Sequence, residues 1–321
     1  MTHVLERRGS SKDVWKVLGH DREVTDVYFV FSERVSVFDA GPLPQTFPGL
    51  GQLRCAISGR IFQALNNAGF NTHYLSHDIE SARMYVKPVN IPAMAPPINY
   101  GDAAVGTMVP VELLCRRMIT KKFLGRIKPF KGLLQGEVNQ SRIEKLLSGE
   151  LREMAVMDPM FVECSTKYEA ADVYLTDNEA AKLVEQNVEW LTDVCYPFVR
   201  KLFKFFYTFL RSTGRLLLID GKIEIALLWD GTPMLVDSAS PDELGLMDSE
   251  GLLADKNILR FYIMEHYPEW YAKLEEAKEL YPTDKSKWPG YPPDLFLPRE
   301  LINAYVEKTR QVAQAIGALK L

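Results

Sequence analysis

The chain has 321 residues, with 38 Lys and Arg against 42 Asp and Glu, so its formal net charge is −4. At about 150 residues per domain, this length predicts about two domains or one large two-lobed unit, and its 47% apolar and 25% charged fractions are typical of a soluble globular protein. The charge balance argues against nucleic acid or an anionic membrane as the main partner.

The first hundred residues are predicted to form strands and turns. Residues 24–31 are rich in β-branched and aromatic side chains, and residues 34–38 alternate polar with apolar ones, so both are predicted strands. Proline and glycine then break the chain at 41–51. Apolar residues recur every fourth position over 53–68, which predicts a helix. Short strands are also expected at 84–89 and 109–116.

The second half is predicted to be largely helical around one hairpin. Residues 178–210 have the periodicity of a helix, with Asp177 as a plausible N-cap. Two apolar runs flank Asp230-Gly231, a dipeptide typical of a β-hairpin turn. Further helices are expected at 252–265 and 302–316. Together with the strands before them, these elements predict an α+β chain of two lobes.

The predicted hairpin carries the most informative polar residues. Lys222 and Glu224 alternate with isoleucine, so both project from one face of a strand. If the Asp-Gly turn has two residues, Glu224 lies opposite Asp237, and these two carboxylates converge with Asp220 beside the lysine. Carboxylates on adjacent strands suit Mg²⁺, which usually also binds substrate phosphates. Spacing alone leaves a solvated strand face with a cross-strand ion pair equally open.

Two other segments could hold an anion. Residues 9–12, Gly-Ser-Ser-Lys, form a small polar loop whose amides could bind phosphate, although an exposed N-terminal turn is the commoner structure. A basic cluster of two arginines and two lysines follows the strand expected at 109–116. It is either a solvated surface or a site for phosphate or carboxylate, and it consists of Arg116, Arg117, Lys121 and Lys122.

The remaining signals are weaker. Four separated cysteines without a C-x-x-C pair predict reduced thiols and no zinc site. Surface positions are expected for His73 and His77, because no third ligand accompanies them. No apolar run is long enough to cross a membrane, and the N-terminus lacks the apolar segment of a secretory signal. We therefore expect a cytoplasmic protein.

Several segments, in the same order along the chain, resemble the SAICAR synthetase (phosphoribosylaminoimidazole-succinocarboxamide synthase) family. The N-terminal matches are G-S-S-K-D-V-W at 9–15 for G-K-x-[KR]-D-x-Y, E-R-V-S-V-F-D at 33–39 for D-R-I-S-A-F-D, and F-P-G-L-G-Q-L at 47–53 for I-P-G-K-G-E-V-L. Later matches are M-V-P-V-E at 108–112, S-T-K-Y-E at 165–169 for T-T-K-A-E, and D-G-K-I-E at 220–224 with D-S-A-S-P-D at 237–242 for D-F-K-L-E and D-E-x-[ST]-P-D.

This resemblance implies an α+β, ATP-grasp-like fold of two lobes. Residues 1–108 would form a β-rich nucleotide-binding lobe, and residues 109–321 a larger α+β lobe with the metal and acceptor sites. It also implies a ligase that uses ATP and Mg²⁺ to join a carboxylate to the amine of aspartate or a similar amine, through an acyl phosphate. The implied partners are these small molecules, with neither nucleic acid nor membrane, and a homo-oligomer is compatible with them.

The resemblance also implies roles for particular residues. Contacts to the nucleotide would come from Lys12, Lys87, Glu112, Lys167 and Glu224. Mg²⁺ would be held by Glu224 and Asp237, and the catalytic group would consist of Lys222, Asp220 and Asp237. The acceptor would be faced by Arg34, Ser36, Asp39, Arg116, Lys121, Lys122 and Asp242. Metal and lysine suit this chemistry because phosphoryl transfer to a carboxylate concentrates negative charge.

The chain departs from the family pattern mainly where the acceptor's phosphate would bind. Lys121-Lys122 stands for the family's Gly-Ser, Leu244-Gly245 for its Ser-Arg, and Ser238 for an acidic residue. Nucleotide binding is therefore expected to persist while the acceptor site is rebuilt. The standard purine step, a related step on a non-purine carboxylate, and a kinase or nucleotide-binding protein without ligase turnover remain alternatives.

Overall fold

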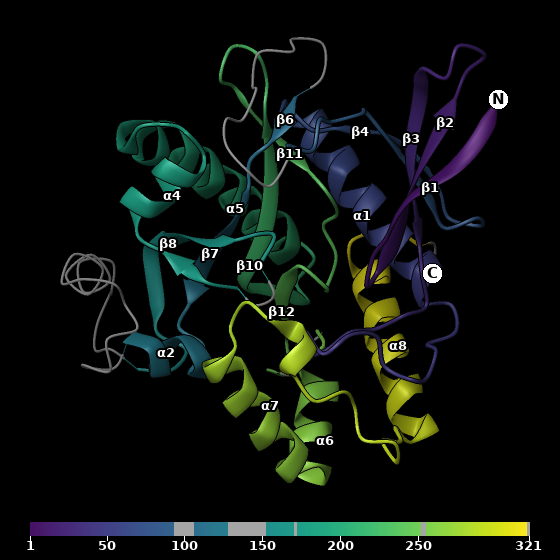
Figure 1. The fold of residues 1–321 in the computed structure, drawn as a ribbon, viewed down its shortest axis with the longest axis vertical. Helices are drawn as coiled ribbons and strands as arrows, with labels where there is room; N and C mark the ends of the chain where they lie inside the picture. The colour runs from purple at the N-terminus through teal and green to yellow at the C-terminus, as the bar shows by residue number, and fades with distance from the viewer. Residues whose placement is uncertain (93–105, 128–151, 170–171, 252–254, 320–321) are drawn as a thin grey trace.

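The computed structural model describes residues 1–92, 106–127, 152–169, 172–251 and 255–319, which form two antiparallel sheets with helices packed around them (Figure 1). The N-terminal sheet has the strand order β1-β2-β3-β5-β4. Its strands are β1 (Thr2–Arg8), β2 (Lys12–Leu18), β3 (Val24–Phe31), β4 (Tyr74–Asp78) and β5 (Arg83–Val86). The expected strand at 24–31 is confirmed as β3.

The predicted strand at 34–38 is wrong. Only an isolated bridge between Ser36 and Pro42 occurs there, and Phe38 and Asp39 have φ angles of 57° and 56°, which no strand accommodates. Val35 and Val37 alternate because both side chains are buried, each being 0% exposed. They belong to a small apolar core that they share with the C-terminal helices.

The second sheet runs in the order β11-β10-β7-β8-β9, and β6 and β12 also pair with the long central strand β10. The strands are β6 (Thr107–Met108), β7 (Val111–Met118), β8 (Val156–Thr166), β9 (Tyr174–Leu175), β10 (Leu216–Leu227), β11 (Pro233–Val236) and β12 (Leu244–Asp248). Because β10 contacts four strands, its side chains meet groups brought from distant parts of the chain.

The helices flank these sheets. They are α1 (Leu50–Asn67), α2 (Lys121–Ile127), α4 (Asp177–Leu183), a π-helix (Trp190–Cys195), α5 (Tyr196–Arg211), α6 (Asn257–His266), α7 (Pro268–Leu280), a 3₁₀ turn (Lys285–Lys287) and α8 (Arg299–Ala315). Figure 1 shows α6, α7 and α8 together at the end of the molecule opposite the β10–β11 turn. The expected helices at 53–68 and 302–316 correspond to α1 and α8, whereas α7 was not predicted.

The predicted helix at 178–210 is interrupted. Its first part ends near Glu185, which has a φ of 52°, and the chain becomes helical again at Trp190. The N-cap is Thr176 rather than Asp177, because Thr176 accepts a hydrogen bond from the amide of Glu179 and the Glu179 carboxylate accepts one from the Thr176 amide. This reciprocal pair is a capping box.

Removing this cap should cost a modest amount of stability. We expect Thr176→Ala to lower the free energy of unfolding by about 1 kcal/mol, because the Glu179 amide loses its side-chain acceptor. Urea denaturation followed by circular dichroism measures this loss. Glu179→Ala should cost less, since it removes only the reciprocal bond. A Thr176→Ala protein as stable as the wild type would contradict the assignment.

One apolar core joins the two sheets. It includes Phe29 from β3, Phe62 from α1, Leu218 and Ile225 from β10, and Phe203 from α5. Burial of this continuous core fixes the two sheets relative to each other, so the site between them is built on rigid elements. The division at residue 108 stays a prediction, and β6 already pairs with the second sheet. Among the described residues, none of the helices is long and apolar enough to cross a bilayer.

Candidate active site

The β10–β11 hairpin exists, but its turn is longer than predicted. Leu227 pairs with Pro233, so five residues connect the strands, and Glu224 lies opposite Val236 instead of Asp237. The predicted convergence of three carboxylates is therefore wrong. Asp220 is four residues from Glu224, roughly 13 Å along an extended strand, and bonds to Arg116 instead. Within the described residues, no group of three or more metal-ligating side chains is assembled.

Lys12 and Asp237 form the first contact of the site. Lys12 begins β2 in the N-terminal sheet, and its Nζ lies 2.9 Å from Oδ2 of Asp237, just after β11. Burial alone would raise the pKa of Asp237, but the charges of Lys12 and Lys167 lower it to about 2. Asp237 also has a φ of 69°, a strained conformation that is often found at functional sites.

Two further lysines pair with carboxylates of the second sheet. Lys167, just after β8, forms an ion pair with Glu224. Lys222 lies 2.7 Å from Oε2 of Glu112 on β7 and 3.8 Å from Oδ2 of Asp172. Burial raises the pKa of Glu112 to about 7, although Lys222 opposes this shift. Three predicted site lysines thus lie close to acidic partners, of which only Lys222 and Glu112 lie on neighbouring strands.

These pairs belong to one cluster of charges. Charges of one ion pair also act across to the other ion pair. The charge of Glu224 raises the pKa of Lys12, whose ion-pair partner is Asp237. The charge of Lys167, whose partner is Glu224, lowers the pKa of Asp237. Glu224 and Asp237 thus act on the same two lysines, Lys12 and Lys167, although the register pairs Glu224 with Val236. Two carboxylates plus substrate phosphates are an ordinary ligand set for Mg²⁺. The donor set consequently fits this ion.

A cavity of about 300 Å³ lies between the loops that follow α1 and β5 and the β10–β11 hairpin, and none of the charged residues of this cluster lines it. Its lining consists of Asn71, Thr72, Lys87, Pro88, Gly106, Leu228 and Met234. His73 is the next residue in the sequence after Thr72, which lines the cavity. Its Nε2 donates to the carbonyl oxygen of Asp237 at 2.9 Å. The predicted nucleotide residue Lys87 thus lies at a cavity that His73 connects to the lysine cluster.

The surface position predicted for His73 is wrong. Its side chain is 1% exposed and packs between the rings of Phe29 and Phe62 at centroid distances of 5.6 Å. Burial lowers the pKa of His73 to about 4. His73 is therefore neutral at neutral pH and supports the loop of Asp237 from inside the core.

The predicted acceptor residue Arg116 lies at the other end of β7 and β10. Its guanidinium bonds to Glu163 on β8 at 2.8 Å and to Asp220 at 3.0 Å. Arg126 of α2 bonds to the same Glu163 at 2.6 Å and lies over the Tyr174 ring at 3.3 Å. The two guanidinium groups are thus balanced by two carboxylates, and neither is a free cation.

Gly245 of β12 pairs with Asp220 in this region. A Cβ atom built on Gly245 would lie only 2.2 Å from Oδ1 of Asp220. Real Cβ atoms do not approach other atoms so closely, so any side chain at 245 requires Asp220 to move. Gly245, which departs from the family pattern, therefore leaves the space in which the Asp220 carboxylate lies while it bonds to Arg116.

The other predicted acceptor residues are dispersed. Arg34 forms an ion pair with Asp13 and donates to the carbonyl of Gly9 at 2.9 Å. Ser36 lies at the isolated bridge, and Asp39 is near Lys222, whose pKa it helps to raise. Lys121 is exposed at the start of α2. Lys122 is in the same helix, but its side chain lies outside the described part of the structure.

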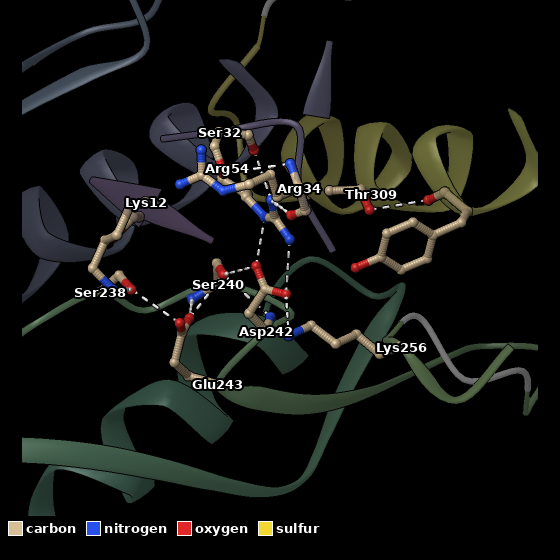
Figure 2. Close-up of polar contacts among 12 residues, drawn as sticks. Lys12, Ser32, Arg34, Arg54, Ser238, Ser240, Asp242, Glu243, Lys256 and Thr309 are labelled. Atoms are coloured by element: carbon tan, nitrogen blue, oxygen red, sulfur yellow. Dashed lines mark hydrogen bonds and ion pairs between the residues drawn. The ribbon is translucent and has the colours of Figure 1, made fainter. Parts of the chain in front are cut away.

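Asp242, also predicted at the acceptor, is in a buried ion pair. Its carboxylate accepts two bonds from Arg54 of α1 and lies 2.8 Å from Nζ of Lys256 (Figure 2). Arg54 is 1% exposed and also donates to the carbonyls of Ser32 and Arg34, each at 2.7 Å. This contact fixes the loop after β11 against α1. A role of Asp242 toward substrate stays a prediction.

Sequence reasoning missed several residues of this region. Two of them, Arg54 in α1 and Glu163 in β8, are charged residues within largely apolar segments. A third, Glu243, comes directly after the motif that ends at Asp242. Their roles follow from tertiary contacts that the local sequence does not indicate. An alternation signal could have found Glu163, because it is the one charged residue in the apolar run of β8 from Met160 to Cys164.

Comparisons with known proteins show the family of this chain. The sequence model of the SAICAR synthetase family matches residues 5–277. A relative from Archaeoglobus fulgidus, named as a candidate phosphoribosylaminoimidazole-succinocarboxamide synthase, is 30% identical over 276 residues, covering 78% of this chain and 76% of its own length. The synthase of Streptococcus pyogenes serotype M3 is 25% identical over 260 residues, or 81% of this chain and 92% of the relative.

Solved structures of this family share the fold. The Saccharomyces cerevisiae SAICAR synthase, determined with SAICAR, gives a TM-score of 0.67 at 17% identity over 99% of this chain and 96% of its own. A SAICAR synthetase in complex with ADP gives 0.56 at 20% identity, over 89% and 99%. The sequence match over most of the chain and this shared two-sheet fold lead to one conclusion: the chain belongs to the SAICAR synthetase family.

Proposed function

We propose that the chain is an ATP-dependent ligase that forms an amide between a carboxylate and aspartate or a similar amine. The observation that carries this proposal is the convergence of Lys12, Lys167 and Lys222 with Glu224 and Asp237, in a cluster that His73 connects to the cavity at the β10–β11 hairpin. Such a density of lysine with paired carboxylates suits a polyphosphate and its metal ion. The relatives determined with ADP and with SAICAR support the same kind of ligand.

In this proposal the nucleotide base occupies the cavity, and its phosphates extend toward Lys12. Residues 1–108 supply Lys12 and Lys87, while residues 109–321 supply the remaining lysines and the two carboxylates. Glu224 and Asp237 would hold Mg²⁺, which screens phosphate charge when it is bound. Lys12 would give its remaining N–H to a phosphate oxygen, and Lys167, now bonded to Glu224, would turn to another.

The reaction is a sequence of two transfers. An oxygen of the substrate carboxylate attacks the γ-phosphorus, the bond to the β-γ bridging oxygen breaks, and ADP leaves with those electrons. The amine then attacks the acyl carbon, inorganic phosphate leaves, and the amine nitrogen loses a proton. Lys222 is placed two residues from Glu224 on the same strand face, so its charge would stabilise the transferred phosphoryl group.

ADP release tests this function. The purified protein is given ATP and Mg²⁺ with panels of carboxylates and amines, singly and together. A ligase releases ADP in proportion to amide when both substrates are present. Stoichiometric phosphorylation that needs no amine would instead identify a kinase, and nucleotide binding without turnover on any pair would identify a binding protein. Either result would overturn the proposal.

A further inference from the structure

Lys12 is held from three directions. Its Nζ donates to Oδ2 of Asp237 and to Oγ of Ser238, both at 2.9 Å, and lies 5.4 Å from the centre of the Phe29 ring. Its side chain is only 11% exposed. An ammonium group has three N–H donors. Among the partners that the structure describes, two are used, which leaves the third for a phosphate oxygen.

The direction of the Ser238 hydroxyl is set by Glu243. A hydroxyl has one proton, and Ser238 donates it to Oε1 of Glu243 at 2.9 Å, so its lone pairs face Lys12 (Figure 2). The other oxygen of Glu243 accepts bonds from the amide and hydroxyl of Ser240, at 2.9 Å and 2.8 Å. The carboxylate is therefore fixed on its own loop and has one face directed at Ser238.

We propose that Glu243 is a positioning residue, which acts through Ser238 to direct Lys12 at the phosphates of the bound nucleotide. This inference rests on the proposed function. Ser238 stands where the family pattern has an acidic residue. Glu243, five residues later, supplies a carboxylate that bonds to the serine hydroxyl, and this hydroxyl in turn accepts a bond from Lys12.

The electrostatics of Lys12 agree with this arrangement. Burial would lower the pKa of Lys12, but the charges of Asp237, Glu243 and Glu224 raise it. The lysine therefore stays charged although it is buried. A charged, pre-oriented donor binds phosphate without the entropic cost of ordering a flexible lysine side chain.

The test compares two buried serines that hold the same loop. Ser238→Ala removes the link between Glu243 and Lys12. Ser58→Ala removes a hydroxyl of α1 that accepts a bond from the Ala239 amide at 3.1 Å, and among the described residues the polar contacts of Lys12 are with Asp237 and Ser238 instead. Calorimetry measures the affinity for Mg-ADP, and steady-state kinetics separate KM for ATP from kcat.

We expect Ser238→Ala and Glu243→Gln each to weaken Mg-ADP binding and raise KM for ATP by about 10-fold or more, as the loss of one oriented bond to a charged group would. Ser58→Ala should lower the melting temperature yet change affinity less than twofold. Ser238→Thr, which keeps the hydroxyl, should restore most of the affinity. Circular dichroism confirms that each variant is folded.

Three results are decisive. Wild-type affinity in folded Ser238→Ala or Glu243→Gln would overturn the inference and leave the proposed function intact. An equal loss of affinity in Ser58→Ala would show that the loop acts only as a structural support, which also overturns it. Failure of the wild type to bind Mg-ADP would instead overturn the proposed function, and the inference with it.

Discussion

Asp237→Asn should lower the rate of ADP release by about 10²-fold or more while the fold is retained. Asp237 bonds to Lys12 and, with its pKa lowered to about 2, stays ionised at every working pH. Asparagine keeps the size of the side chain but removes the charge that would hold Mg²⁺ and orient the lysine. Loss of one such charge-stabilising group typically costs about 10²- to 10³-fold in rate.

This substitution leaves the backbone undisturbed. Asp237 has a φ of 69°, and asparagine is among the few residues that adopt this left-handed conformation readily. Asp230→Asn in the turn of the same hairpin is the matched control, because Asp230 is exposed and its carboxylate accepts local turn bonds, including one from the Thr232 amide at 2.9 Å. Steady-state ADP release and melting temperature are measured for both. Wild-type turnover in Asp237→Asn would refute the metal and phosphate assignment.

Local patterns were enough to predict much of the fold. The strand β3, the helix α1 and the β10–β11 hairpin each have a periodicity or a turn dipeptide within a few residues. The length of the hairpin turn was not predictable, because Asp-Gly is also compatible with the five-residue connection between Leu227 and Pro233. That difference moved the partner of Glu224 from Asp237 to Val236.

The candidate site was predicted only in part, for a related reason. Lys12, Lys167, Lys222, Glu224 and Asp237 were marked by motifs, and the structure brings them into one charge cluster. Their partners come from elements far apart in sequence. The π-helical break before α5, the burial of His73 and the pairing of Arg116 with Glu163 depend on tertiary packing, which no local pattern records.

The acceptor site should make little use of a phosphate on its substrate. By the family pattern, an arginine would stand at 245, but Gly245 occupies that place and Asp220 fills the space where a Cβ would lie. Two described guanidinium groups of this region, on Arg116 and Arg126, are already balanced by Glu163 and Asp220. Arg260 also acts on Asp220, because its charge opposes the rise that burial causes in the pKa of Asp220, and it donates to Asn257 at 3.0 Å. A phosphate dianion placed here would meet the charge of Asp220, and Arg116 and Arg126 could neutralise it only by giving up their carboxylate partners.

The expected result is poor use of the phosphoribosyl-imidazole carboxylate. Loss of a bidentate arginine–phosphate contact costs roughly 1.5–3 kcal/mol, or about 10- to 150-fold in affinity. We therefore expect kcat/KM below ~10⁴ M⁻¹s⁻¹, and less than a tenfold change when the ribosyl compound replaces its phosphorylated form. Lys121, exposed at the start of α2, is the described lysine that could compensate as a point charge.

Steady-state kinetics with ATP, aspartate and each form of the carboxylate measure this preference, and Lys121→Ala serves as the comparison. If Lys121 binds the phosphate, its removal should affect only the phosphorylated substrate. A kcat/KM of ~10⁴ M⁻¹s⁻¹ or above that depends strongly on the phosphate would mean that the substitutions are neutral and that the chain performs the ordinary purine step. Weak turnover on both forms would instead direct the search to anionic heterocycles or acyl acids without a phosphate, because Arg116 and Asp220 are then arranged for a different acceptor.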